Sequence, residues 1–424
     1  MNTGMVSGNA DLEDSGAQKW LSLAQTAQHG ARPGVQAPWV VVQRVDDVDP
    51  ARAAKQALAE LDGGATGLSL VFEGAPNAFG YGLPATRKAM ETVLADVPLS
   101  RTYLRIDAHP ASRATADWLV SFLTQRRADP AKLSLSFGID PAAIFAGTGR
   151  LSMSIEALEA SMPQSLAHFF ALGIPGVLLE ADGRVFHNAG ATGAQELGAM
   201  LAAATTYLRL FAEARQALVY ATPHIGFALS VDDDPILSAA KVKALRKLWT
   251  RVQKEAAIPP SVTTIHAETS YRMLSLNPEA NVVRATIACH AAAAGGADSI
   301  SVLPATAPFG LANAAARQAA CNTQLVLADS GLSSPDLEPV IDKLSAAAWK
   351  EYQAIEAEGG MLASLAAGRL QERVLLARNQ RPPAGAIETA RSMTSDIGTV
   401  EAQRRPLPTD GAVFCQRLDA VLLG

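Results

Sequence analysis

One pair of side chains, His266 and Glu268, has the types and spacing suited to acid–base chemistry. The run before them is rich in β-branched residues, which favours a strand over residues 262–266. The pair is therefore expected at or just past the carboxyl end of a strand, where α/β folds keep their chemistry. An imidazole and a carboxylate at that place can position or transfer a proton. The alternative is a hydrogen-bonded pair in a barrel mouth with no chemical role.

Other polar motifs are weaker candidates for a site. Asp232, at the start of the run Asp-Asp-Asp-Pro, is expected in an acidic helix N-terminus rather than in a metal cluster, because adjacent loop carboxylates rarely converge on one ion. His187 precedes a long helix that Asn188 or Thr192 is expected to cap. Tyr81 lies in a loop from which it can reach a ligand. No Gly-x-Ser-x-Gly elbow and no zinc-deaminase Pro-Cys-x-x-Cys motif is present.

Composition excludes several classes of protein. The three cysteines, Cys289, Cys321 and Cys415, are far apart and form no Cys-x-x-Cys pair, so we interpret them as reduced thiols of a cytoplasmic protein. The net charge of −5 provides no electrostatic footprint for nucleic acid or an anionic membrane. No apolar run is long enough to span a bilayer, and residues 1–16 lack the pattern of a signal peptide.

The elements that must position these side chains follow a regular order. From residue 67 an apolar strand, a polar loop and an alanine-rich helix alternate, which predicts a parallel sheet with crossover helices. The predicted strands are 67–72, 102–106, 133–139, 176–179, 225–230, 262–266 and 299–303. The predicted helices lie near 85–95, 112–126, 152–172, 192–214, 236–256, 278–294 and 312–328. Pro339 weakens an eighth strand that is otherwise expected at 337–341.

This order fits an α/β fold of the (β/α)8 TIM-barrel type or an open doubly wound sheet. No Gly-x-Gly-x-x-Gly follows the first strand and no Gly-x-x-x-x-Gly-Lys occurs, so the barrel is favoured. The predicted organisation is an N-terminal arm at 1–37, the barrel at 38–340, a helical extension at 341–381 and a linker-like tail at 382–424. The arm is expected to be disordered or to wrap on a partner subunit. Two helices separated at Gly359-Gly360 are expected in the extension.

A series of short motifs carries a resemblance to a known family. The motifs are Pro38-Trp39, residues 67–72, Gly80-Tyr81, residues 188–192 with 195–197, residues 247–249, 266–270, 281–284, 322–325 and 355–361. Over about residues 38–380 the chain resembles the substrate barrel of methylmalonyl-CoA mutase, and more closely its small, non-catalytic subunit. The resemblance implies a soluble barrel from an isomerase family of propionate metabolism.

The resemblance also implies that catalytic positions are replaced. The family's tyrosine beside the migrating group corresponds to Arg44, and one of its basic residues corresponds to Val42. The family's Tyr-His pair falls on Arg184 and Val185, while His187 stands two residues too late. A buried arginine must be paired or solvated, so these positions do not suit a closed, neutral radical pocket.

Two further positions continue this comparison. The family's thioester-facing glutamine falls at or near Asp140, and the His-Cys-Gln segment keeps its histidine as His266 while Glu268 replaces the glutamine. The expectation is therefore a vestigial pocket with no catalytic residue and no metal. Its residues would be Tyr81, Asp140, His266, Glu268, Arg44 and Arg184.

The cofactor is expected elsewhere. No Asp-x-His-x-x-Gly cobalamin signature is present, and about forty residues follow the helices, fewer than a cobalamin domain takes. By resemblance, this chain alone binds no cofactor, and adenosylcobalamin belongs to the partner or the complex. The expected function is that of a non-catalytic structural partner in a heterodimer with a catalytic mutase subunit, or in a homodimer. The alternatives are a barrel subunit of a split acyl-CoA mutase and a module that binds a CoA ligand.

Overall fold

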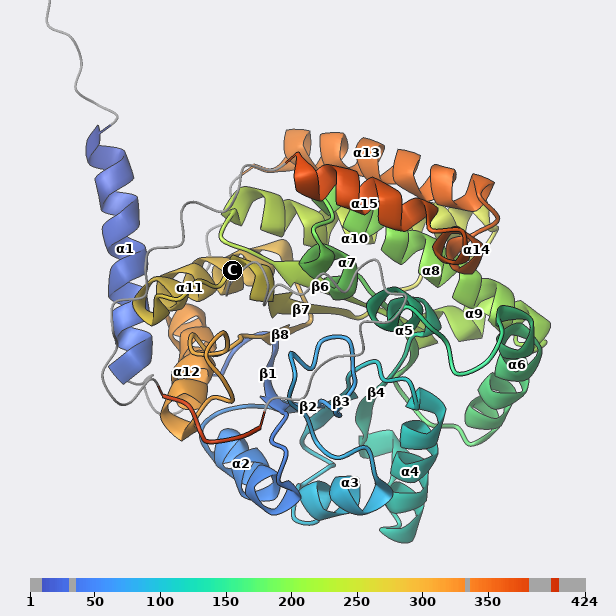
Figure 1. Cartoon of the computed structure of the whole chain (residues 1–424), viewed down its shortest axis with the longest axis horizontal. Helices are drawn as coiled ribbons and strands as arrows, with labels where there is room; N and C mark the ends of the chain where they lie inside the picture. Colours follow the sequence, from blue (N-terminus) through green and yellow to red (C-terminus); the bar gives the residue numbers. More distant parts are fainter. Residues whose placement is uncertain (1–9, 30–35, 332–335, 381–397, 404–424) are drawn as a thin grey trace, which may run out of the picture.

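Eight parallel strands close into a barrel in sequence order, each hydrogen-bonded to the next and β8 to β1 (Figure 1). The computed structural model describes residues 10–29, 36–331, 336–380 and 398–403. The strands are β1 Val40–Val45, β2 Gly67–Leu70, β3 Tyr103–Ile106, β4 Ser134–Ile139, β5 Val177–Asp182, β6 Ile225–Val231, β7 Ile265–Thr269 and β8 Ser299–Ser301. The predicted TIM barrel is confirmed.

The prediction lacked strand β1. The prediction of an eighth strand at 337–341 is wrong. Val40, Val41 and Val42 are β-branched, and this run pairs with both β2 and β8. Pro339 instead lies in the first turn of a helix that begins at Glu338, where a missing N–H costs no helical hydrogen bond.

Helices surround the barrel on all sides (Figure 1). Those that follow the strands are α2 Pro50–Asp62, α3 Arg87–Leu94, α4 Ser112–Gln125, α5 Pro141–Thr148, α6 Ile155–Ala171, α7 Arg184–Ala189, α8 Gly193–Glu213, α9 Leu218–Ala221, α10 Pro235–Glu255, α11 Pro278–Gly295 and α12 Ala314–Ser330. The seven predicted crossover helices are confirmed within a few residues. Thr192 caps α8 in a capping box with Gln195, as the sequence predicts for this loop.

Strand β7 begins three residues later than predicted. Val262 is 85% exposed and lies before the strand. His266 is therefore the second residue of β7 rather than its last, and its side chain lies inside the barrel instead of at the carboxyl end. Only Glu268 stands near that end. The pair shares one face of the strand because side chains two residues apart point the same way.

Polar side chains line the barrel interior, where branched apolar residues are usual. Small side chains come from even-numbered strands and large charged or polar ones from odd-numbered strands. The small residues include Ser69, Ser136 and Ser299, and the large ones include Arg44, Arg105, Glu180 and His266. Hydrogen-bonding contacts join the two sets: Arg105 to Ser69, Ser136 to Glu180 and His266 to Ser299. The apolar core lies between the strands and the helices.

The amino-terminal helix, α1 Ala10–His29, packs against α11 and α12 of the same chain (Figure 1). Trp20 contacts the ring of His290 edge-on at 4.9 Å, and Asn322 donates a 3.0 Å hydrogen bond to the carbonyl of Ala27. The described part of the arm therefore lies on its own barrel.

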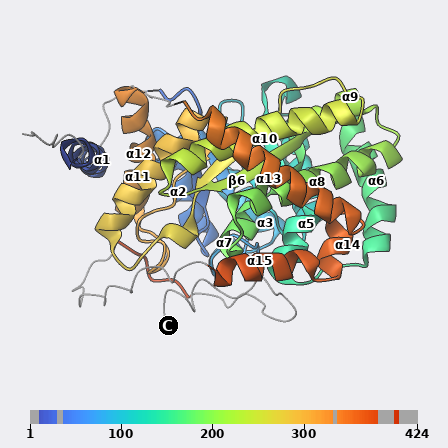
Figure 2. The ribbon, with the colours of Figure 1, turned by 90° about the horizontal axis from the view of Figure 1, so that it is seen from above.

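Three helices, not two, follow the barrel: α13 Glu338–Ala357, α14 Met361–Ala366 and α15 Arg369–Asn379. The second break falls at Gly368, whose φ of 72° is the left-handed conformation that glycine adopts without cost. Helix α13 lies across α8 and α10 and buries Leu344, Ala348 and Trp349 there (Figure 2). The apolar face of 344–352 is thus covered within the chain. Of the tail, only 398–403 is described.

No helix in the described part of the chain is long and apolar enough to cross a membrane. Cys289 and Cys321 are buried free thiols, and burial raises the pKa of Cys321 to about 12. Cys415 lies outside the described residues.

Candidate functional site

Arg44 on β1 and Arg184 on α7 hold the carboxylate of Glu268 between them at the carboxyl end of the barrel. Arg44 Nη1 lies 2.9 Å from Glu268 Oε2, and Arg184 Nη1 lies 3.1 Å from Glu268 Oε1. All three side chains are at most 4% exposed. The structure thus brings together three of the residues predicted from the sequence, and it joins them as an ion-paired cluster.

Four more charged residues extend this cluster across the barrel. Arg184 also pairs with Asp182 Oδ2 at 2.6 Å and with Asp107 Oδ1 at 3.0 Å. Arg105 forms ion pairs with both Asp107 and Glu180. The cluster therefore contains three arginines and four carboxylates, and it links β1, β3, β5, α7 and β7. We call it the barrel ion cluster; its members are Arg44, Arg105, Asp107, Glu180, Asp182, Arg184 and Glu268.

The charges of this cluster fix the protonation of its neighbours. Burial raises the pKa of Glu268, but the charges of Arg184 and Arg44 outweigh burial and lower it below its usual value. Burial, followed by the charges of Arg105, Arg184 and Arg44, lowers the pKa of His266 well below its usual value. His266 is therefore a neutral imidazole at pH 7. Its Nδ1 contacts Ser299 Oγ at 2.9 Å, and its Nε2 has no hydrogen-bond partner among the described residues.

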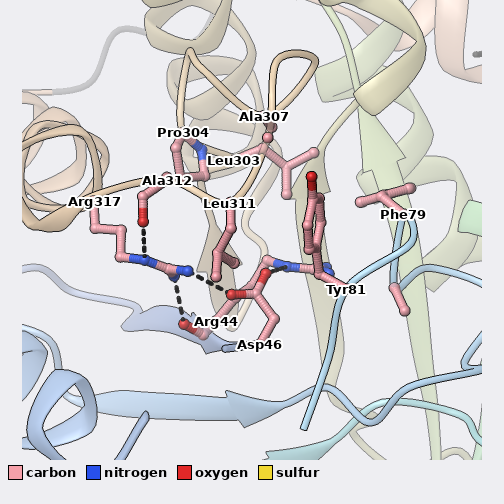
Figure 3. Close-up of a pocket in the computed structure, with 12 residues that line it drawn as sticks. Arg44, Asp46, Phe79, Tyr81, Leu303, Pro304, Ala307, Leu311, Ala312 and Arg317 are labelled. Atoms are coloured by element: carbon pink, nitrogen blue, oxygen red, sulfur yellow. Dashed lines mark hydrogen bonds and ion pairs between the residues drawn. The ribbon is translucent and has the colours of Figure 1, made fainter. Parts of the chain in front are cut away.

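Tyr81 lies in the loop after β2 and lines a cavity of about 30 Å³ at the mouth (Figure 3). The cavity also touches Arg44, Asp46 and Arg317, and Arg317 bridges Asp46 and the carbonyl of Arg44 at 2.6 and 3.2 Å. A cavity must offer roughly 10–15 Å³ to hold one water molecule. Tyr81 therefore borders room for one or two waters.

Asp140 does not join the barrel ion cluster and has a structural role. Its carboxylate caps α5 by accepting from Ala143 N at 2.9 Å, and it also accepts from Asp182 N at 2.7 Å and from the hydroxyl of Tyr207. Burial raises the pKa of Asp140 to about 7 despite these hydrogen bonds. Such a carboxyl group has a higher pKa in the folded protein than in the unfolded chain, where the pKa is near 4. The folded protein therefore loses stability as the pH increases from the unfolded pKa to the folded pKa.

The Tyr207→Phe substitution is expected to destabilise the protein by about 1–3 kcal/mol at pH 8 and by less at pH 5, because the lost donor serves the ionised carboxylate. Its removal shifts the pKa of Asp140 further upward. Denaturant unfolding at the two pH values measures the difference. The exposed Tyr220→Phe is the matched control and should change stability at neither pH. An equal loss at both values would contradict the role given to the Asp140 carboxylate.

His187, Ser270 and Glu196 have the arrangement of a nucleophile, a base and an orienting acid. His187 Nε2 lies 2.8 Å from Ser270 Oγ, and His187 Nδ1 lies 3.3 Å from Glu196 Oε2. All three are at most 1% exposed, so no substrate reaches the hydroxyl. Burial and the charges of Arg272 and Lys241 lower the pKa of His187 to about 4, which makes it a poor general base at pH 7. We therefore assign this set a structural role.

The acidic run after β6 behaves as the sequence predicts. Asp234 caps α10 by accepting from Leu237 N at 2.9 Å, Asp232 lies 3.7 Å from Arg272, and Asp233 lies 3.4 Å from Arg284. Within the described residues no group of three or more His, Cys, Asp or Glu side chains is arranged to hold a metal ion.

Sequence reasoning missed Arg105, Asp107, Glu180 and Asp182. The sequence contained a signal for them. Arg105 and Asp107 are separated by one residue at the end of a predicted strand, as are Glu180 and Asp182, and His266 and Glu268 have the same spacing. Side chains at that spacing lie on one face of a strand. Three such pairs on alternate strands of a barrel must face one another across its axis.

Comparison with known proteins identifies the family of this chain. Residues 29–394 match the family described as methylmalonyl-CoA mutase. The chain is 32% identical over 372 residues to the methylmalonyl-CoA mutase small subunit of Streptomyces virginiae, covering 82% of this chain and 58% of that protein. It is 31% identical over 350 residues to the small subunit of Propionibacterium freudenreichii subsp. shermanii, covering 78% and 52%. A probable small subunit of Mycobacterium tuberculosis (strain ATCC 25618 / H37Rv) is 34% identical over 293 residues, 64% of this chain and 46% of that protein.

The chain thus spans about half the length of these relatives. The match nevertheless includes every strand of the barrel, from β1 to β8. This chain belongs to the methylmalonyl-CoA mutase family and is similar to its small subunits.

Proposed function

We propose that this chain is a non-catalytic partner of a cobalamin-dependent acyl-CoA mutase subunit. The observation that supports it is the barrel ion cluster, in which Arg44 and Arg184 hold the carboxylate of Glu268 across the mouth. A radical rearrangement needs a closed pocket with room for the substrate, and the cofactor's protein must exclude competing reactions there. A mouth that is crossed by ion-paired side chains does not offer that room.

The histidines at the mouth offer no ligand to the cobalt of a corrin. His109 and His187 are the described histidines that follow the carboxyl ends of strands, and both are buried. His109 contacts Glu73 O and Ala111 N through its two ring nitrogens, at 2.8 and 3.0 Å, and His187 contacts Ser270 and Glu196. Neither offers a free nitrogen as a cobalt ligand. We therefore assign adenosylcobalamin to the partner subunit or to the complex.

The alternatives assign a ligand to the barrel itself. A split mutase would react on this chain once a second polypeptide supplied cobalamin, and a CoA module would bind acyl-CoA without reaction. The small cavity beside Tyr81, about 30 Å³, favours neither, because it offers room for one or two waters. A heterodimer, rather than a homodimer, is the assembly that this proposal requires.

Co-expression of the full chain with a catalytic methylmalonyl-CoA mutase subunit tests the proposal. A one-to-one complex by light scattering is expected, in which the catalytic subunit isomerises methylmalonyl-CoA. The chain alone should retain no adenosylcobalamin and show no turnover. Turnover with an isolated cobalamin-binding protein would contradict the proposal in favour of the split enzyme. Stoichiometric binding of acyl-CoA to the chain alone, by calorimetry, would contradict it in favour of the CoA module.

A further inference from the structure

We propose that Arg44 and Arg184 form a receptor for a small carboxylate, and that the side chain of Glu268 occupies this receptor from within the chain. One guanidinium nitrogen approaches each oxygen of the carboxylate, at 2.9 Å from Arg44 and 3.1 Å from Arg184. Planar guanidinium groups recognise carboxylates in this way in many binding sites. The inference concerns the site itself and does not depend on the proposed partnership with a mutase subunit.

The receptor is held in place without Glu268. Arg184 is fixed by Asp182, which accepts from its Nε at 2.9 Å and from its Nη2 at 2.6 Å. Arg44 donates from Nη2 to the carbonyl of Asn77 at 2.7 Å and from Nε to Asp46 at 3.3 Å. Each guanidinium group therefore keeps its orientation when Glu268 is shortened. A preorganised site loses little free energy to ordering when a ligand binds.

Arg44 depends on Glu268 for compensation of its charge more than Arg184 does. Asp46, its other close carboxylate, is shared with Arg317, and Asp107 lies 3.8 Å away. Without Glu268, Arg44 is a buried cation short of a partner, which is a strongly unfavourable arrangement. A bound anion would compensate the charge of Arg44.

Two polar atoms around Glu268 remain available to a ligand. Arg184 Nη1 contacts Glu268 by charge but makes no hydrogen bond in the described structure. Ser301 Oγ also has no hydrogen-bond partner among the described residues, and Ser301 is in register with Glu268 on the adjoining strand β8. Both residues are buried. A free carboxylate has fewer restraints than a side chain and can align with these donors.

The atoms that each substitution of Glu268 removes determine which small molecule fits the space left behind. Glu268→Ala removes a methylene group and a carboxylate, which together match acetate. Glu268→Gly removes one carbon more and matches propionate. Acetamide has the shape of acetate without its charge. Glu268→Gln fills the space with a neutral amide and leaves no room for any of these molecules.

An aromatic pair lies beside Arg44. Phe79 stacks on Tyr271 at 4.0 Å with an interplanar angle of 11°, and the guanidinium of Arg44 lies 5.2 Å from the Phe79 ring. Phe79 has a φ of 52°, which is unusual for an aromatic residue and places strain in this loop. Fluctuations of a protein admit small molecules to enclosed engineered cavities, so formate-sized and acetate-sized anions are suitable probes.

The test is the unfolding of the full-length Glu268→Ala protein at pH 7 in sodium acetate, with sodium chloride and acetamide at matched concentrations. Acetate at 100 mM is expected to raise the folding equilibrium constant about tenfold over chloride, as a dissociation constant of about 10 mM implies, and the effect should grow with the acetate concentration as one plus its ratio to that constant. Wild type and Glu268→Gln should show no such difference. Glu268→Gly should respond to propionate more strongly than to acetate.

An equal response of Glu268→Ala to acetate, chloride and acetamide would overturn the proposal. If Glu268→Ala is insoluble as expressed, its refolding from denaturant is compared in the same three solutes. Recovery of folded protein that depends on acetate supports the receptor, whereas recovery that is equal in the three solutes, or absent in all of them, overturns it. These outcomes do not involve the partner subunit, so they are separate from the test of the proposed function.

Discussion

The Arg184→Leu substitution is expected to lower the free energy of unfolding by about 4 kcal/mol or more at pH 7, or to prevent folding altogether. Arg184 is fully buried and pairs with Asp107, Asp182 and Glu268. Removal of one member of a buried ion pair typically costs about 3–5 kcal/mol, because the remaining charge stays buried without a partner. Here three carboxylates lose the same cation. Denaturant unfolding and the yield of soluble protein measure the effect.

The pH dependence separates this electrostatic cause from simple loss of packing. Arg184 is the largest charge that lowers the pKa of Glu268, so in the variant burial raises that pKa with only Arg44 and Arg105 to oppose it. A carboxyl with a raised folded pKa destabilises above its unfolded pKa, near 4, and this effect fades as the pH falls. The difference between variant and wild type should therefore narrow from pH 7 to pH 5. A constant difference would indicate a packing defect.

The exposed Arg209, paired with Glu356, provides the control: Arg209→Leu should cost less than about 1 kcal/mol.

The Glu196→Gln substitution is expected to cost about 3–5 kcal/mol at neutral pH. Glu196 Oε2 lies 2.7 Å from Lys241 Nζ, and Oε1 accepts from Ser230 N at 2.9 Å. The neutral amide has one carbonyl oxygen, which can accept from Lys241 or from Ser230 N but not from both, and it leaves the buried ammonium without an opposite charge at this position. Burial raises the pKa of Glu196, but the charges of Lys241 and His187 and their hydrogen bonds lower it to about 2. Relative to an unfolded value near 4.3, such a shift corresponds to about 3 kcal/mol of stability.

This contribution has a defined pH window. A depressed folded pKa stabilises the protein above the unfolded pKa, and the effect is lost as the pH falls through the folded value. The difference between wild type and Glu196→Gln should therefore be constant above about pH 5 and shrink towards pH 2. The double variant Glu196→Leu with Lys241→Met removes both charges and should recover part of the loss. Glu338→Gln, at the exposed pair with Lys247, is the matched control and should cost less than about 1 kcal/mol. A loss as small as this control would contradict the role of Glu196.

Much of the fold could be predicted because it depends on local signals. Strand and helix periods, proline in first turns and the capping residues Thr192 and Asp234 are encoded within a few positions of where they act. The exceptions were also local. Strand β1 precedes the regular alternation of strands and helices that begins at residue 67, so the repeat did not include it, and Pro339 was compatible with either a poor strand or a good helix start.

The candidate site was predicted only in part, for a different reason. The resemblance identified Arg44, Arg184, His266 and Glu268 as replaced or retained positions, but it did not say what those side chains contact. Glu268 was paired with His266 in sequence reasoning because the two are neighbours in the chain. In the folded protein Glu268 is bound by Arg44, more than 200 positions away along the chain, and by Arg184.

By itself, the sequence determined the barrel, its order of elements and its family, because periodicity and motifs are properties of short segments. Only the tertiary structure decided the state of the mouth. Closing the barrel brings side chains from alternate strands to one axis, where solvent is excluded and each charge must find an opposite charge. Whether Arg44, Arg184 and Glu268 line an open pocket or pair with one another depends on the distances between strands, and the sheet must close before those distances are set.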